Sequence, residues 1–257
     1  MITLCLPYEK DSAQLEKTLD ILANTSGEYT LELYKNPTVN VSEARQIMMD
    51  NCKTKHICFL DYDSEMVDPE WLNKIMQTMQ EKDAAGVFPL ERWGVSKNLT
   101  QGCTEDREVS YGPAACMLLD MDKVGDLKWD KHIGLRSGWL GGDFEEVDFC
   151  FRALKKGHKL YRCASTHFNH TGGKTTLEDF VKTDRSVSVR VMRLMLDYKY
   201  RKDPDNEDYF KGIKYVRADP NNDCTLGKGQ SFRKCYHEVI KRNGLSYIQS
   251  FKKLGLV

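Results

Sequence analysis

Carboxylate pairs are the first residues in this sequence whose spacing suggests chemistry. Two aspartates one residue apart can bind a hard divalent cation such as Mg²⁺ or Mn²⁺, which prefers carboxylate oxygens. Aspartate is also a common turn residue, so the spacing alone does not separate a metal site from a turn. The Asp-x-Asp pattern occurs three times, at Asp61 and Asp63, at Asp120 and Asp122, and at Asp203 and Asp205.

The surroundings of the three pairs differ. Asp61 and Asp63 follow the apolar run HICFL, which predicts a buried strand over residues 56 to 60. After them, Asp68 is expected to cap a helix that has Pro69 at its first position. The second pair follows a strand predicted over residues 114 to 119, and the third lies in an acidic break after a helix. We therefore predict a metal site at the first pair and turns at the other two.

A second acidic group stands at the start of a predicted helix. Asp143, Glu145 and Glu146 precede or open a periodic segment over residues 145 to 156, which Gly157 is expected to cap. Acids in the first turn favour the helix dipole, and neighbouring negative charges raise the pKa of a carboxyl group toward neutral pH.

Two further groups of residues flank this acidic helix. A glycine-rich stretch before it carries Trp139, Gly141 and Gly142, and the tryptophan could anchor this loop. His167 and His170 follow a strand predicted over residues 160 to 163. Taken by themselves, they could be core or capping residues.

The predicted elements place several of these groups at one edge of a sheet. Strands over residues 2 to 6, 29 to 34, 56 to 60 and 84 to 89 alternate with helices over residues 13 to 22, 42 to 51 (capped by Ser42) and from 69 on. This alternation predicts an α/β fold with a mostly parallel sheet and helices on both faces. Ligands bind at the carboxyl ends of such strands, where Pro7, Tyr8 and Glu9 would join the first aspartate pair. Residues 91 to 112 are polar and predict a long loop.

Composition restricts the class of protein. The 257 residues are 40% hydrophobic, and no apolar run reaches the roughly 18 residues that a membrane span needs. Nine cysteines without a Cys-x-x-Cys pair indicate reduced thiols in a cytosolic protein. Net charge is zero, but residues 182 to 257 carry 17 basic and 9 acidic side chains. That basic part could bind an anionic partner or simply the acidic first part of the chain.

Three motifs in order resemble the inverting GT-A nucleotide-sugar glycosyltransferases, the large family that includes cellulose, chitin and hyaluronan synthases. They are ITLCLPYEKD, then VSEARQIMMDNCKTKHICFLDYDSEMVDPEWL, then GDFEEVDFCFRALKKGHKLYRCASTHFNH. The resemblance implies a GT-A (Rossmann-like) catalytic domain over residues 1 to 175 and leaves residues 176 to 257 as a helical, basic C-terminal extension packed on it.

The resemblance also implies roles for individual residues. Asp63 would be the direct ligand of Mn²⁺ or Mg²⁺, with His170, while Asp61 would bind the metal or the donor ribose. Glu146 matches the family's catalytic base, with Glu145 and Asp143 as alternatives. The donor would contact Pro7, Tyr8, Glu9, Arg45, Asp61 and Tyr62, and the acceptor would contact Trp139, Gly141 and Gly142. The family suggests a UDP-sugar, but its acidic turn after the second strand is missing, since Glu32 lies inside that strand.

The expected function is transfer of a sugar from a nucleoside-diphosphate sugar to an acceptor hydroxyl, with inversion. One acceptor hypothesis is DNA carrying hydroxymethylated pyrimidines, which would place the protein in the cytoplasm of a bacterium or of a phage-infected cell. A glycan or protein acceptor is the alternative. A non-catalytic nucleotide-sugar-binding module and a nucleotidyltransferase of similar fold are the rivals from other functional classes.

Overall fold

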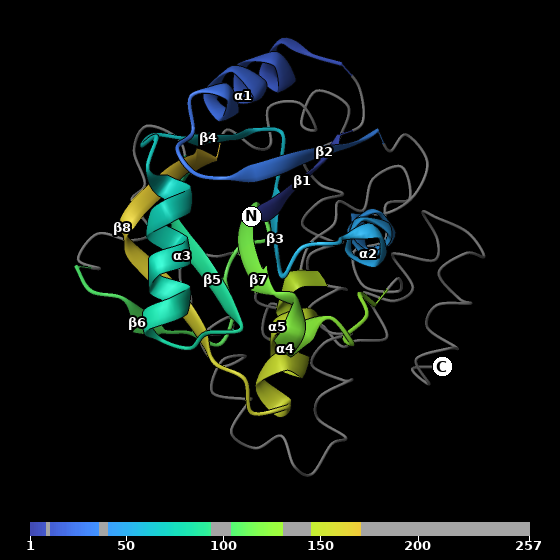
Figure 1. The fold of residues 1–257 in the computed structure, drawn as a ribbon, viewed down its shortest axis with the longest axis vertical. Helices are drawn as coiled ribbons and strands as arrows, with labels where there is room; N and C mark the ends of the chain where they lie inside the picture. The colour runs from blue at the N-terminus through green and yellow to red at the C-terminus, as the bar shows by residue number, and fades with distance from the viewer. Residues whose placement is uncertain (9–10, 36–40, 94–103, 131–144, 171–257) are drawn as a thin grey trace, which may run out of the picture.

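The structure is a computed structural model that describes residues 1–8, 11–35, 41–93, 104–130 and 145–170. The predicted C-terminal extension over residues 176 to 257 and the glycine-rich stretch before the acidic helix lie outside these ranges. Within them, a single mixed sheet forms the centre of the molecule, and helices cover both of its faces (Figure 1).

The sheet has eight strands, and most of them run in one direction. Seven follow the order β2 (Tyr29–Lys35), β1 (Ile2–Tyr8), β3 (His56–Leu60), β7 (Cys116–Asp120), β5 (Gly86–Trp93), β8 (Leu160–His170), β4 (Ser64–Met66), and β6 (Arg107–Glu108) pairs with β8. The pairings give β1, β2, β3, β5 and β8 one direction and β4, β6 and β7 the other. The prediction of a mostly parallel sheet is confirmed, with the antiparallel β7 inserted between β3 and β5.

Alternating side chains divide the core into two layers. Cys58 and Leu60 of β3 face the layer that contains α1 (Ala13–Ala23) and α3 (Trp71–Glu81). Ile57 and Phe59 face the layer that contains α2 (Val41–Asn51), α4 (Met121–Val124) and α5 (Glu145–Lys155). A strand with both faces apolar must be covered on both sides, so the run HICFL explains why helices cover both faces.

Helix ends follow local capping chemistry, with two corrections to the predicted boundaries. Helix α3 begins at Trp71, because the Asp68 carboxylate accepts a hydrogen bond from the Glu70 backbone N–H at 2.9 Å and closes a turn before the helix. Ser42 lies inside α2 instead of capping it. The Gly157 cap is confirmed: Gly157 has φ +83°, and its N–H donates to the Leu154 carbonyl at 2.8 Å.

Strands β5 and β8 are longer than the sequence pattern predicts. They extend to Trp93 and His170, so part of the expected loop over residues 91 to 112 is strand. Their register shifts between Pro89, opposite Cys163, and Leu90, opposite His167. Proline cannot donate a ladder hydrogen bond, which makes it a natural place for such an irregularity. Beyond the shift, β8 continues and carries His170 to the edge of the sheet where β1 and β3 end.

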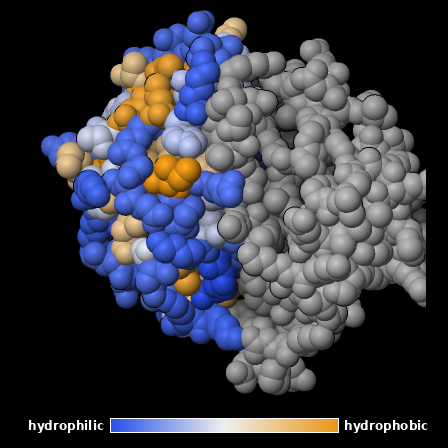
Figure 2. All heavy atoms as spheres, turned by 90° about the vertical axis from the view of Figure 1, so that its right-hand side faces the viewer, coloured by the Kyte–Doolittle hydropathy of each residue, from blue (hydrophilic) through white to orange (hydrophobic). Residues whose placement is uncertain are grey.

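The remaining sequence expectations concern thiols and membranes. Six cysteines lie in the described ranges, all are free thiols, and five of them are buried. None of the helices in these ranges is long and apolar enough to cross a membrane. The described surface visible in Figure 2 is mostly hydrophilic, with apolar residues in small, separate patches.

Candidate functional site

Strand direction brings distant residues together at one edge of the sheet. Strands β1, β3 and β8 run in parallel, so their carboxyl ends, at Tyr8, Leu60 and His170, lie at the same edge. Asp61 follows β3 directly, and its carbonyl accepts a hydrogen bond from the Ser64 N–H at 3.0 Å. This turn leads into β4, whose first residue pairs with His170. The turn and the end of β8 are therefore held side by side.

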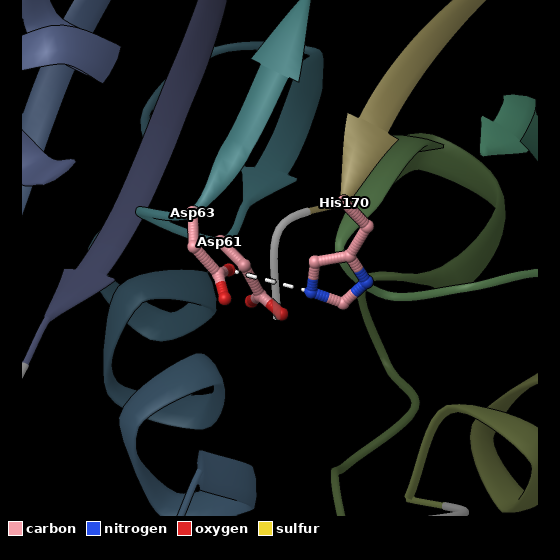
Figure 3. Close-up of side chains that lie close together, drawn as sticks. All are labelled: Asp61, Asp63 and His170. Carbon is pink, nitrogen blue, oxygen red and sulfur yellow. Dashed lines mark ion pairs between the residues drawn. The ribbon is translucent and has the colours of Figure 1, made fainter. Parts of the chain in front are cut away.

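Asp61, Asp63 and His170 form a compact group of possible metal ligands. One ligand atom from each residue lies within 4.8 Å of the others. Figure 3 shows the two carboxylates and the imidazole converging from the turn after β3 and from the end of β8. All three side chains are partly buried, with exposures of 28% for Asp61, 13% for Asp63 and 12% for His170. The sequence-predicted metal residues are thus close neighbours in space.

This donor set fits a divalent cation. Two carboxylates suit hard cations such as Mn²⁺ and Mg²⁺, and an imidazole nitrogen is a ligand that first-row transition metals accept well. The combination favours Mn²⁺ over Mg²⁺, because Mg²⁺ prefers an all-oxygen octahedron. The separation of the three atoms is short enough for one ion to contact all of them.

His170 is held by carboxylates on both ring nitrogens. Its Nε2 lies 3.3 Å from Asp63 Oδ1, and its Nδ1 lies 2.6 Å from Glu91 Oε1. Burial lowers the pKa of His170, but the hydrogen bonds to Asp63 and Glu91 outweigh it and raise the pKa to about 10. With this pKa the ring is an imidazolium at neutral pH and pairs with both carboxylates. A cation that binds Nε2 must replace that proton.

Glu91 is a site residue that sequence reasoning missed. It lies on β5 opposite Phe168, two residues from His170 along β8. Histidines that ligate metals usually donate their second ring N–H to a carboxylate, which sets the tautomer and the orientation of the ring. Glu91 is placed to do this for His170. No local pattern marks it, because it lies in a segment whose polar composition predicted a loop.

Arg45 contacts both the metal group and helix α5. Its side chain is 2% exposed, its Nη2 donates to Asp61 Oδ1 at 3.0 Å, and its Nη1 donates to Glu145 Oε1. Burial by itself lowers the pKa of Arg45, but the charges of Asp61 and Glu145 outweigh it and raise the pKa above its ordinary value. Arg45 therefore stays charged and joins the turn after β3 to the first turn of α5.

The three acids that could act as a base have different surroundings. Glu145 is buried, with 4% of its side chain exposed, and it binds Arg45. Glu146 is half-buried, and Asp143 lies outside the described residues. The first turn of α5 also contains Asp148, which is fully buried and pairs with Arg152 at 2.8 Å. Of the two candidates that the structure describes, Glu146 is the one with accessible surface.

The expected donor-binding residues are partly described. Pro7 and Tyr8 end β1 and are half-buried, and the Lys35 ammonium lies 5.8 Å from the centre of the Tyr8 ring. Tyr62 is half-buried between the two aspartates, and its carbonyl accepts a hydrogen bond from Thr18 at 2.6 Å. Glu9 and the expected acceptor residues Trp139, Gly141 and Gly142 lie outside the described ranges.

The fold is similar to that of several solved structures. S. aureus TarS matches with a TM-score of 0.53 at 10% identity over 75% of this chain and 39% of that one. TarS residues 1–349 in complex with UDP-GlcNAc give 0.54 at 10% identity, over 75% of this chain and 65% of that one. GalNAc-T7 with UDP, GalNAc and Mn²⁺ gives 0.54 at 11% identity, over 95% and 58% of the two chains.

These likenesses concern the fold. The chain spans less than two thirds of the length of each of these structures. No protein-family model matches the sequence, and no curated protein is similar to it in sequence. The strand order, the helices on both faces and the structural matches agree with the resemblance that the three sequence motifs carry. The chain has the GT-A fold of nucleotide-sugar glycosyltransferases.

Proposed function

We propose that this chain is a divalent-cation-dependent glycosyltransferase that moves a sugar from a nucleoside-diphosphate sugar to an acceptor hydroxyl. The observation that carries the proposal is the convergence of Asp61, Asp63 and His170 at the carboxyl edge of a GT-A sheet. In open α/β sheets this edge is where ligands bind. The ligand atoms come from segments about a hundred residues apart, so their proximity is a product of the fold.

Asp61, Asp63 and His170 would hold the cation. When bound, it would balance the negative charge of the departing nucleoside diphosphate. Asp63 and His170 are the less exposed ligands and would anchor it, while Glu91 keeps the imidazole oriented. The proposed donor contacts are Pro7, Tyr8, Asp61 and Tyr62, which lie at or beside the ends of β1 and β3, together with Glu9. TarS and GalNAc-T7 were solved with UDP-GlcNAc or UDP, which supports a UDP-sugar as the first donor to test.

Glu146 is the residue that we assign as the general base. It would take the proton from the acceptor hydroxyl as this oxygen attacks the anomeric carbon. Attack from the face opposite the leaving diphosphate gives inversion. Glu145 is less suited, because its carboxylate is buried against Arg45 and a base must reach the acceptor. Asp143 remains the alternative base, and Trp139, Gly141 and Gly142 remain the proposed acceptor contacts.

The proposed acceptor is DNA that carries hydroxymethylated pyrimidines. The support is the excess of 17 basic over 9 acidic side chains in residues 182 to 257. Binding to DNA phosphates releases counterions, so the affinity should fall by about 10³-fold or more between 50 and 200 mM salt if six or more phosphates are contacted. Activity on a glycan or a protein that does not change with salt would replace DNA by that acceptor.

The direct test of the function is release of UDP from UDP-sugars in the presence of Mn²⁺, with and without candidate acceptors. Mn²⁺-dependent release that Asp63→Ala abolishes and Asp122→Ala retains is the expected result. Binding of UDP-sugar without turnover under every acceptor condition would favour a non-catalytic binding module. Release of pyrophosphate from a nucleoside triphosphate would identify a nucleotidyltransferase instead.

A further inference from the structure

We infer that Arg45 is a positioning residue that couples the cation site to helix α5, so that the ion pair between Arg45 and Glu145 sets how strongly Asp61 holds a cation. The inference rests on the proposed function, because the cation site and the base on α5 are parts of it. It assigns Arg45 a role other than the donor contact that the family resemblance implies. A side chain that is 2% exposed offers almost no surface to a nucleotide-sugar.

The first observation is the shared guanidinium. Nη2 of Arg45 donates to Asp61 in the metal group, and Nη1 donates to Glu145 in the first turn of α5. Asp61 and Glu145 are 84 residues apart in the sequence, and a single side chain of α2 joins them. The fork of the guanidinium is rigid and planar, so it constrains both carboxylates at once.

The second observation is an aromatic frame around the same guanidinium. The Arg45 guanidinium lies 5.4 Å from the centre of the Trp129 ring. This ring stacks on Phe149 of α5, with centroids 4.5 Å apart and planes at 19°, and meets Phe59 of β3 edge-on at 5.6 Å. The backbone N–H of Trp129 donates to the Gln46 side chain at 2.8 Å. The three elements that carry Asp61, Arg45 and Glu145 are thus packed around one ring.

The third observation is that the arrangement leaves buried polar atoms unsatisfied. Nε of Arg45 and Oε2 of Glu145 are buried and have no hydrogen-bond partner among the residues that the structure describes. Buried ion pairs contribute little to folding stability, and well-packed apolar residues in their place often give a protein that is equally stable. Stability alone therefore does not explain a buried pair with unsatisfied polar atoms, whereas a role in the cation site does.

The charges predict a direction. Arg45 divides its positive charge between Asp61 and Glu145. If Glu145 is replaced by the neutral glutamine, the guanidinium is attracted to Asp61 alone and competes more strongly with a cation for that carboxylate. The loss of the negative charge of Glu145 also weakens the electrostatic attraction of the site for a cation. Glu145→Gln should therefore weaken cation binding although Glu145 is not among the ligands.

The test measures binding of Mn²⁺ alone to the full chain, by titration calorimetry and by the rise in melting temperature at fixed Mn²⁺ concentration. Glu145→Gln should weaken Mn²⁺ binding by about 10-fold, at the lower end of the effects of partners beyond the ligands. The matched control is Asp148→Asn. Asp148 is also a buried carboxylate on α5 that pairs with an arginine, and this arginine is Arg152 instead of Arg45. Asp148→Asn should lower stability and leave Mn²⁺ affinity within about 2-fold, because Arg152 is not the arginine that binds Asp61.

A double-mutant cycle isolates the path. In an Arg45→Gln background, the effect of Glu145→Gln on Mn²⁺ affinity should shrink to less than about 2-fold, because the residue that transmits it is gone. If Arg45→Gln does not fold, the comparison of Glu145→Gln with Asp148→Asn decides alone. A Lys at position 45 keeps the charge but not the fork, so Arg45→Lys should keep the folded state and lose part of the coupling.

Different outcomes refute different statements. Equal Mn²⁺ affinities for Glu145→Gln and the wild type, with Asp63→Ala still abolishing binding, would overturn the coupling and leave the proposed function intact. Equal losses for Glu145→Gln and Asp148→Asn would also overturn it, because general destabilisation would then explain both. A wild-type chain that does not bind Mn²⁺ would remove the metal site on which both proposals rest.

Discussion

The Asp61–Asp63 and Asp120–Asp122 pairs have the same spacing, and each follows a buried strand of the same sheet. Strand β3 ends at Leu60 and strand β7 ends at Asp120, and the two strands are antiparallel neighbours. Their carboxyl ends therefore lie at opposite edges of the sheet. The first pair meets His170 and Arg45, whereas the second meets the solvent-exposed Lys55.

The second pair caps a helix. Asp120 Oδ1 accepts a hydrogen bond from the Asp122 N–H at 3.0 Å and caps the short helix α4. The structure therefore has a strand end and a helix N-terminus where the sequence predicted a turn. The comparison shows that the direction of the preceding strand, and so the edge at which the carboxylates emerge, decides what an Asp-x-Asp pair can contact. The third pair, Asp203 and Asp205, lies outside the described residues.

The largest expected difference between the pairs is in cation binding. Asp63→Ala should weaken Mn²⁺ binding by more than about 100-fold, since a direct ligand contributes more than the roughly 10- to 100-fold of its supporting partners. Asp122→Ala should leave the affinity unchanged, because its carboxylate is 70% exposed and pairs with Lys55 at the opposite edge of the sheet. Calorimetric titration of both variants with Mn²⁺ checks this. Similar losses in the two variants would end the distinction between the pairs.

A smaller effect should separate the partners of the two pairs. Glu91→Gln should weaken Mn²⁺ binding by about 10-fold, because the imidazole of His170 loses the carboxylate that orients it. The matched change at the other edge is Lys55→Met, which removes the partner of Asp120 and Asp122 and should not alter Mn²⁺ affinity. The same titration tests both. A Glu91→Gln chain that binds Mn²⁺ like the wild type would show that Glu91 does not support the ligand.

The second pair should matter for stability. Asp120→Ala should lower the free energy of unfolding by about 0.5–2 kcal/mol, the usual effect of losing an N-cap side chain. Urea denaturation at constant m-value measures it. Mn²⁺ affinity of the folded protein should not change. A cation-binding defect in Asp120→Ala would mean that the two edges of the sheet are coupled in a way that the fold does not explain.

The smallest expected effect is that of Lys55→Met on stability. Lys55 is 57% exposed, and ion pairs of this kind contribute about 0–1 kcal/mol. Denaturation curves of Lys55→Met and the wild type should therefore differ by less than those of Asp120→Ala and the wild type. A larger loss for Lys55→Met would indicate that the ion pair, and not the cap, holds α4 in place.

Local patterns predicted the elements better than their ends and directions. The apolar run HICFL predicted the strand over residues 56 to 60, and helical periodicity predicted the helix over residues 145 to 156, both to within one residue of the observed bounds. The same patterns contain no information on direction, so the reversal of β7 was not predicted. They also ended β8 at Cys163, because the run THFNH lacks an apolar stripe. Its pairing with β5 and β4 keeps that run extended.

The candidate site divides in the same way. Asp61, Asp63 and His170 could be proposed as metal residues because short motifs mark them. Glu91 and the Arg45–Glu145 ion pair carry no such mark. Glu91 is 79 residues from His170 in the sequence, and Arg45 is 100 residues from Glu145. Only the strand order and the packing of α2 and α5 against one face of the sheet bring them together.

The most direct test of the central claim is calorimetric titration of the full chain with UDP-GlcNAc in the presence of Mn²⁺. The account predicts binding to the wild type and to Asp122→Ala, and no binding to Asp63→Ala or to the wild type in a chelator. Equal binding of UDP-GlcNAc by Asp63→Ala, or by the wild type without a divalent cation, would contradict a cation-dependent donor site at the first aspartate pair.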